Sequence, residues 1–407
     1  MRDRIPFLWS RRRGAIAAVG LVGGLIGAAY VSALRLLELA LSPDAHSQWV
    51  TVGVLGAVGL AIAVITRKLG DAGDVELLVD NIHVAGGAND VRALRSLIPV
   101  SLLGIAAGSA LGPEAPLVQT AGTMGTATGA RMGFDRDTVR VLTITGMAAA
   151  FAVLFGAPLG SAIFALEILH RRGLEYYEAM LPAIGGASIG FFVFAGLNRV
   201  GFEPILHLPD ATTVGPADLG WSVVAGILGS ALAVSFIISV RGFRTAARRI
   251  PTAIRPMVGG VAIGLLAVWS GAALTFGEGQ IDVVVAGGLA TSTLAAALVA
   301  KVLASSICLA TGWKGGFIIP LFFIGATAAQ LVHVAVPSAP VGVLVAACMV
   351  ATNVAVTKTP IGTTLVVAEM GGVHLVPSMT IAALLAFVIT SEVGLIQTQR
   401  TRETAEP

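Results

Sequence analysis

Charged side chains are scarce in this sequence of 407 residues: only 12% are Asp, Glu, Lys or Arg, whereas soluble domains carry about 25%. Hydrophobic residues make up 56% of the chain. Such a composition excludes an ordinary soluble domain. It indicates a chain that lies mostly in the lipid bilayer, and we expect a multi-pass protein of the cell membrane.

Net charge and cysteine content are also low. The formal net charge of +3 is too small to indicate a nucleic-acid partner. The two cysteines, Cys308 and Cys348, both lie in apolar stretches, where they are typical of small buried hydrophobic residues. Nothing around them indicates a disulfide framework or a metal site, and we expect neither a metal nor a cofactor.

Apolar stretches recur along the whole chain. Several exceed the roughly 18 residues that predict a membrane-spanning helix. Others are too short to cross, and with 50 glycines in the chain we expect broken or re-entrant helices among them. The stretches are 14–32, 51–65, 141–169, 179–198, 219–240, 257–274, 294–310, 317–335, 340–356 and 376–391. The predicted fold class is therefore an all-α integral membrane protein.

The distribution of charge predicts how the chain crosses the membrane. Basic residues cluster at 11–13, at 67–68, within 241–255 and at 400–402, and the positive-inside rule places these segments, with both termini, in the cytoplasm. The segment 201–219 contains acidic residues but no Lys or Arg, and we expect it to face outward. We interpret the first apolar run as an uncleaved helix.

Two pairs of matching segments indicate a duplicated chain. The stretch Ala157–Glu167 matches Thr359–Glu369 at an offset of 202 residues, with the same Pro, Gly and Glu positions. Residues 112–117 match 316–321 at an offset of 204. One half starts inside and the other outside, which predicts an inverted-topology repeat of tilted and broken helices. The predicted divisions are a first repeat over 1–200, a connecting loop over 201–219, a second repeat over 220–398 and a cytoplasmic tail over 399–407.

The segment Gly108-Ser-Ala-Leu-Gly-Pro-Glu-Ala-Pro116 is the most informative in the chain. Its glycines and prolines interrupt an apolar region, which predicts a helix that begins inside the membrane near Pro113. The free N–H groups of such a helix end attract an anion. Glu114 lies in the first turn, where its carboxylate can act as a tethered anion that leaves when protonated. The alternative is a glutamate that only caps its helix.

Gly312-Trp-Lys-Gly-Gly-Phe-Ile-Ile-Pro320 is the counterpart in the second half. Its adjacent glycines allow a sharp turn, after which the N–H groups of Phe317 and Ile318 would face the same ion from the other side. The alternative is a simple Gly/Pro kink.

Apolar segments also contain two glutamates, for which two interpretations stay open, and three lysines. Glu167 and Glu369 end the matching motifs, where they fit either a proton relay or a structural polar bond between helices. Lys301, Lys314 and Lys358 lie at the edges of apolar segments, and we expect them to extend toward the membrane surface.

Two other functions fit parts of the sequence. Gly186-Ala-Ser188-Ile-Gly190 fits the G-x-S-x-G motif and His333 lies in an apolar stretch, so that an intramembrane serine hydrolase is conceivable. Small-residue packing explains this motif better, and we expect the protein not to be an enzyme. A cation-coupled solute transporter of inverted-repeat architecture is the other alternative.

At these motifs the sequence resembles the CLC family of chloride channels and proton-coupled chloride transporters. The segment 112–116 is similar to the family's G-[KR]-E-G-P motif, and 316–320 is similar to its G-x-F-x-P motif. The resemblance spans residues 14–398. It implies a homodimer with a separate pore in each subunit, Glu114 as the gating residue, and an anion held by Gly112, Gly316, Phe317 and Ile318.

Three departures from the family pattern bear on the substrate. Ala72 stands where the family has a pore serine, and the pore tyrosine is absent, with Gln397 or Gln399 nearby. Ile168 stands where proton-coupled members carry a second glutamate, unless Glu167 replaces it. The resemblance therefore implies passage of chloride or another small inorganic anion by a channel or an uncoupled transporter, with Ala72 beside the ion.

Overall fold

The computed structural model describes residues 11–41, 47–73, 75–88, 91–170, 177–199, 206, 208 and 214–399. These residues form sixteen α-helices and two short 3₁₀-helices, and the described part of the chain contains no strand. Seven of the described helices are long and apolar enough to cross a membrane: α1, α2, α6, α8, α9, α12 and α13. Several others are apolar but shorter, in agreement with the expected mixture of spanning and broken helices.

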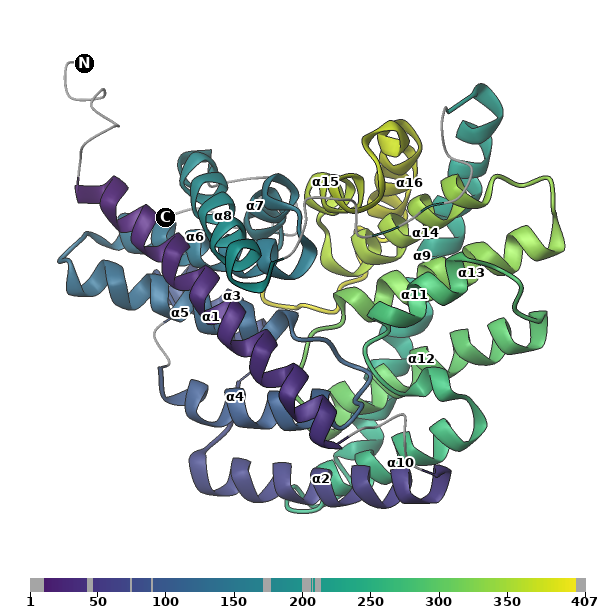
Figure 1. Cartoon of the computed structure of the whole chain (residues 1–407), viewed down its shortest axis with the longest axis horizontal. Coiled ribbons are helices and arrows are strands. Elements are labelled where there is room, and N and C mark those ends of the chain that lie inside the picture. The colour runs from purple at the N-terminus through teal and green to yellow at the C-terminus, as the bar shows by residue number, and fades with distance from the viewer. Residues whose placement is uncertain are drawn as a thin grey trace.

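The first eight helices come from the first half of the chain (Figure 1). They are α1 (Arg11–Leu41), α2 (Gln48–Leu69), α3 (Val75–Ala85), α4 (Val91–Ala106), α5 (Glu114–Arg131), α6 (Arg136–Phe155), α7 (Pro158–Glu167) and α8 (Tyr177–Asn198).

The second half supplies eight more helices in the same order. They are α9 (Pro216–Ala247), α10 (Arg255–Trp269), α11 (Glu278–Val285), α12 (Thr291–Thr311), α13 (Ile318–Ala335), α14 (Val341–Thr357), α15 (Pro360–Gly371) and α16 (Val376–Ile389). The 3₁₀-helices η1 (Gly271–Ala273) and η2 (Val373–Leu375) precede α11 and α16.

Corresponding helices have corresponding neighbours. Helix α5 packs on α6, α6 on α8, and α8 on α1, while α13 packs on α14, α14 on α16, and α16 on α9. Helices α5 and α13 are each 18 residues long, and α13 begins and ends 204 residues after α5. The duplicated architecture expected from the sequence is confirmed by this pairwise correspondence.

The two halves meet through pairs of equivalent helices. Helix α2 packs on α10, and α7 packs on α15. Figure 1 shows these pairs on opposite sides of the molecule, with α7 packed on α8 and α15 on α16. The paired segments that resemble each other in sequence, 157–167 and 359–369, are thus neighbours in space.

Small residues allow the helices of each half to approach closely. A Cβ atom added at Gly20 of α1 would lie 2.9 Å from the carbonyl oxygen of Gly186 on α8, and one added at Gly190 would lie 2.9 Å from Cβ of Ala149 on α6. The two glycines of the G-x-S-x-G motif are therefore explained by packing of α8 between α1 and α6.

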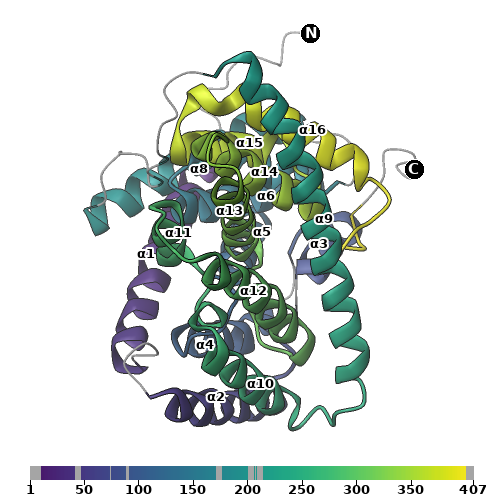
Figure 2. The same cartoon turned by 90° about the vertical axis from the view of Figure 1, so that its right-hand side faces the viewer.

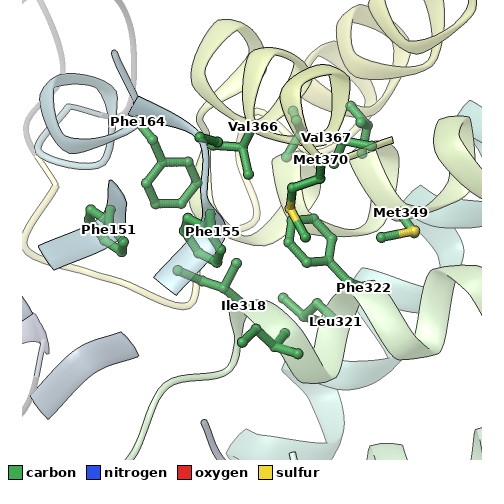
Figure 3. Close-up of a cluster of buried hydrophobic side chains, with 14 of the residues drawn as sticks. Phe151, Phe155, Phe164, Ile318, Leu321, Phe322, Met349, Val366, Val367 and Met370 are labelled. Atoms are coloured by element: carbon green, nitrogen blue, oxygen red, sulfur yellow. The ribbon is translucent and has the colours of Figure 1, made fainter. Parts of the chain in front are cut away.

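An aromatic cluster joins the halves beside the start of α13. The ring centroids of Phe155 (α6) and Phe322 (α13) are 6.2 Å apart, and Phe151 lies 4.9 Å from Phe164 of α7. Figure 3 shows these rings with Ile318, Leu321 and residues of α15 in one buried cluster. Such dense packing fixes the N-terminus of α13 relative to α6 and α7.

Parts of the predicted boundaries lie outside the described residues. Most of the loop predicted over 201–219 is among them, although α9 begins within it, at Pro216. There the backbone N–H of Gly215 donates a 2.7 Å hydrogen bond to the Asp218 carboxylate, an N-terminal cap that uses one of the loop's acidic residues. Residues 1–10 and 400–407 are also outside the described part. The cytoplasmic position of both termini stays a prediction.

Candidate functional site

Gly112 and Gly316 bring the two halves together at one point. They form an antiparallel bridge in which the Gly112 N–H donates to the Gly316 carbonyl at 2.8 Å and the Gly316 N–H donates to the Gly112 carbonyl at 2.6 Å. Helix α5 begins two residues after Gly112, and α13 begins two residues after Gly316. The bridge therefore places two helix N-termini side by side within the protein.

The two helix starts have the same local chemistry. Pro116 and Pro320 occupy the third position of α5 and α13, where a proline loses no helical hydrogen bond. The first N–H bonded within each helix follows: Leu117 donates to the Pro113 carbonyl at 3.1 Å, and Leu321 donates to the Phe317 carbonyl at 3.0 Å. The preceding N–H groups point out of the helix ends, where the dipole is positive.

The carboxylate of Glu114 occupies the N-terminus of α13. Its Oε1 accepts a 2.7 Å hydrogen bond from the backbone N–H of Ile319, and the side chain is 1% exposed. Its Oε2 is buried and has no hydrogen-bond partner among the described residues. An acidic side chain thus lies where a helix end favours an anion, as the sequence predicts for a tethered anion.

Both bridging residues must be glycine for the carboxylate to fit. A Cβ atom added at Gly112 would lie 2.7 Å from Cδ of Glu114, and one added at Gly316 would lie 2.8 Å from Cβ of Glu114. Such distances are shorter than van der Waals contact permits, so any larger residue would displace the Glu114 side chain.

Two cavities are lined by residues at the start of α13. We call the first the Lys314 vestibule; it is lined by Lys314, Gln119, Phe317 and Ile396, and by Ala115 and Pro116 of α5. The second, the Glu278 vestibule, is lined by Glu278, Asp282, Ile319 and Phe322. The residues that flank the Glu114 carboxylate thus line both cavities: its neighbour Ala115 lines the first, and Ile319, whose N–H it binds, lines the second.

A small apolar cavity borders the carboxylate itself. Its lining includes Glu114, Phe151, Ile168, Phe317 and Ile318. Ile168, at the position where the family resemblance implies a second glutamate in proton-coupled members, therefore lines the same cavity as Glu114.

Ala72 lies near the vestibule but in apolar surroundings. It is fully buried and packs with Leu94 and Leu97, while its neighbour Gly73 lines the Lys314 vestibule together with Leu97. The structure thus brings together Gly112, Glu114, Gly316, Phe317 and Ile318 and places Ala72 at the side of the approach to them. Its methyl side chain has no polar atom to offer an ion.

Neither Gln397 nor Gln399, the two glutamines near the position of the absent pore tyrosine, lines the Lys314 vestibule. The amide of Gln399 donates to the carbonyl oxygens of Ile168 at 2.9 Å and Thr357 at 2.8 Å, and Gln397 is exposed. Leu395 and Ile396 instead line the Lys314 vestibule. Sequence reasoning missed them because no motif surrounds them.

Glu167 and Glu369 make reciprocal contacts between α7 and α15. The Glu167 carboxylate accepts hydrogen bonds from the N–H groups of Gly362 at 2.6 Å and Ile361 at 3.3 Å. The Glu369 carboxylate accepts the equivalent bonds from Gly160 at 2.8 Å and Leu159 at 3.3 Å. Each carboxylate therefore caps the N-terminus of the other repeat's helix.

The expectation for two of the three lysines was wrong. Lys301 is fully buried, and its Nζ donates to the Leu274 and Thr275 carbonyls and to Oε1 of Gln280 at 2.7–3.0 Å. Lys358 is 2% exposed and donates to oxygens of Ala355 and Thr390. Backbone carbonyls at helix and loop ends satisfy both ammonium groups, so neither needs to reach water.

Comparisons with known proteins show the family to which this chain belongs. The model of the family described as voltage gated chloride channel matches residues 58–391. A chloride/fluoride channel protein of Pseudomonas syringae pv. tomato is 29% identical, over 98% of this chain and 88% of that protein. An H(+)/Cl(−) exchange transporter of Cronobacter sakazakii is 27% identical, over 80% of this chain and 72% of its own.

Solved structures share the fold. A slow cyanobacterial Cl⁻/H⁺ antiporter superimposes with a TM-score of 0.82 at 22% identity, covering 95% of each chain. A CLC-type fluoride/proton antiporter gives 0.80 at 22% identity, covering 95% of this chain and 97% of the other. The motifs, the paired helix ends and the family match lead to one conclusion: this chain belongs to the voltage gated chloride channel (CLC) family.

Proposed function

We propose that this protein carries chloride or another small inorganic anion across the membrane through the site between α5 and α13, with Glu114 as the gate. The hydrogen bond from the Ile319 N–H to the Glu114 carboxylate is the observation that carries the proposal. A group that stabilises a carboxylate oxygen at 2.7 Å would equally stabilise an inorganic anion in its place.

Gating follows because the Glu114 carboxylate and the inorganic anion compete for the same helix end. An ionised Glu114 is attracted to the positive end of α13 and blocks it, whereas a protonated Glu114 loses that attraction and leaves the site to the anion. The backbone of Gly112, Gly316, Phe317 and Ile318 then surrounds the ion, and Ala72 lies at the side of the approach. Low pH opens the pathway.

The proposed transport is uncoupled from protons. Ile168 has no titratable group and faces the cavity that Glu114 also lines, so protons have no acid there through which to reach the gate. Glu167 is the remaining candidate for an internal relay, although it already caps α15. Proton-coupled exchange is the second candidate function, because both solved relatives described above are named antiporters.

Ion replacement in liposomes tests the anion proposal. Purified protein in vesicles should release chloride, and fluoride is the second anion to compare because a relative is named for both ions. Vesicles that leak potassium but retain anions would contradict the proposal and favour a cation-coupled transporter. A pH-sensitive dye in the same vesicles distinguishes the mechanisms: an imposed chloride gradient should move no protons.

We also propose that the protein forms a homodimer. Glu369 is partly exposed and accepts a hydrogen bond from the N–H of Leu159, whose side chain is exposed, as is that of Ile361 at the equivalent position of α15. A carboxylate exposed to lipid is costly, whereas a second copy would cover it. Cross-linking of detergent-purified protein should trap dimers, and a monomer at all concentrations would contradict this.

A further inference from the structure

A further cavity, with a basic lining, lies beside the Lys314 vestibule, between the end of α2 and the start of α10. Its volume is about 540 Å³, in the range of cavities that hold small organic ligands. We call it the basic cavity, and it contains none of the residues of the proposed gate.

Three cations and one carboxylate among the described residues line the basic cavity. Arg67 comes from the last turn of α2, Arg255 is the first residue of α10, and Lys314 precedes α13. Asp71 supplies the carboxylate. Three threonines add hydroxyl groups: Thr66, Thr252 and Thr311. The described lining thus has an excess of positive charge and of hydrogen-bond donors.

The guanidinium and ammonium groups keep donors for a ligand. Arg255 donates from Nη2 to the Ile250 carbonyl at 3.1 Å, while its Nε is buried and has no hydrogen-bond partner among the described residues. Lys314 has three N–H donors, two of which bind Asp71 at 3.3 Å and Gly73 at 2.7 Å. A planar guanidinium beside an ammonium suits a phosphate group, which accepts several charge-assisted hydrogen bonds.

The flanks of the cavity are apolar. Leu60 and Val64 of α2 are 46% and 44% exposed, and Leu265 of α10 is 49% exposed. Figures 1 and 2 show α2 and α10 along an outer edge of the molecule. An acyl chain lying along these helices would place its headgroup at their ends, next to Arg67 and Arg255.

We propose that the basic cavity binds a phosphate-bearing anion, supplied either by the headgroup of an anionic lipid or by soluble phosphate. Basic pockets between membrane helices on the cytoplasmic side are typical sites for such headgroups, and the charge distribution of the sequence predicts that Arg67 and Arg255 lie on that side.

A ligand in the basic cavity would affect the proposed anion pathway, because the same residues line both. Gly312 and Lys314 line both the basic cavity and the Lys314 vestibule. Trp313 lines the vestibule and donates from Nε1 to the carbonyl of Pro256, which lines the basic cavity, at 2.9 Å. A bound phosphate competes with Asp71 for Lys314 and changes the charge at the vestibule. Binding itself is independent of the proposed function, whereas its effect on flux rests on it.

The full-length protein in neutral detergent tests binding directly. Calorimetry would compare three probes: short-chain phosphatidylglycerol, short-chain phosphatidylcholine, whose headgroup carries no net charge, and inorganic phosphate. Arg67→Gln and Arg255→Gln remove cations that line the cavity. Lys68→Gln is the matched control, because Lys68 is an exposed cation of the same helical turn that does not line it.

Phosphatidylglycerol should bind, and both arginine variants should weaken that binding by about tenfold or more, because charge-assisted hydrogen bonds are lost. Lys68→Gln should bind like the unaltered protein. If inorganic phosphate displaces the lipid, soluble phosphate is a sufficient ligand; if only the lipid binds, the acyl chains are required. Equal binding of phosphatidylcholine and phosphatidylglycerol without binding of phosphate, or equal weakening by Lys68→Gln, would overturn the proposal.

Discussion

Gly112 and Glu114 occupy adjoining space so closely that a Cβ atom at residue 112 would lie 2.7 Å from the Glu114 carboxyl carbon. All three of the atoms nearest to that added Cβ belong to the Glu114 carboxyl group. The size of residue 112 therefore controls whether the Glu114 carboxylate can reach α13.

The variant Gly112→Ala is predicted to expel the Glu114 carboxylate from its position. We expect greater anion flux at neutral pH and a loss of stability of about 1–3 kcal/mol from overpacking. Flux from vesicles and thermal unfolding in detergent measure both effects.

The double variant Gly112→Ala/Glu114→Ala supplies the internal control, because truncation of Glu114 removes the carboxyl group that the alanine would meet. Stability relative to Glu114→Ala alone should then change by less than about 1 kcal/mol. Gly196→Ala has open space around it and should be tolerated in any background. If Gly112→Ala is equally harmful with and without Glu114, the steric account is wrong.

Replacement of Glu114 by glutamine removes the charge but preserves the shape. The N–H of Ile319 would then bond to a neutral amide, which costs about 1.4 kcal/mol or more of attraction to the helix end. Flux at neutral pH should rise by about tenfold and should no longer depend on pH. A variant whose flux keeps the pH profile of the unaltered protein would remove Glu114 from the gate.

The reciprocal caps predict matched losses of stability. Glu167→Gln and Glu369→Gln each weaken hydrogen bonds to a helix N-terminus, and each should cost about 1–2 kcal/mol. Glu178→Gln, at an exposed position of α8, should cost little. Chemical unfolding measures these changes. A relay role for Glu167 would appear separately, as an altered pH dependence of flux in Glu167→Gln that is absent in Glu369→Gln.

Asp71, which lies outside the membrane-spanning segments, should make the stability of the fold depend on pH. The Lys314 ammonium holds the pKa of the Asp71 carboxyl below its usual value. A lowered pKa in the folded state stabilises the fold above the unfolded-state pKa, and this contribution is lost as pH falls through the folded-state pKa. Because the Asp71 side chain is 82% exposed, the contribution should be at most about 1 kcal/mol.

The test of this pair compares Asp71→Asn with the unaltered protein across the acidic range. The variant should be less stable than the unaltered protein at neutral pH. The free energies of unfolding of the two proteins should become equal as the solution becomes acidic enough to protonate Asp71. High salt should reduce the difference at neutral pH. A difference that persists in acid would show that the ion pair is not its cause.

The sequence was most informative where the backbone itself forms the site. Gly112, Pro116, Gly316 and Pro320 locate both helix starts, because glycine and proline restrict the backbone in ways that do not depend on distant residues. The matching segments likewise predicted the duplicated architecture, since each repeat must fold by the same local rules.

The sequence did not predict the specific contacts between residues that are far apart in the chain. The N–H that Glu114 accepts from belongs to Ile319, one residue beyond the pair expected from the sequence, because the register of the bridge decides which group faces the carboxylate. Lys301 finds its carbonyl partners in the turn before α11, which no pattern around residue 301 indicates. Leu395 and Ile396 reach the vestibule only through the path of the chain after α16.

The reciprocal bonds of Glu167 and Glu369 have a consequence for the origin of the protein. In each bond, one repeat supplies the carboxylate and the other supplies the helix end, and the pair is unchanged when the repeats are exchanged. Two separate copies of a half-length ancestor, inserted in opposite orientations, would make the same two bonds with each other. Gene fusion could then join the copies and keep both of these bonds.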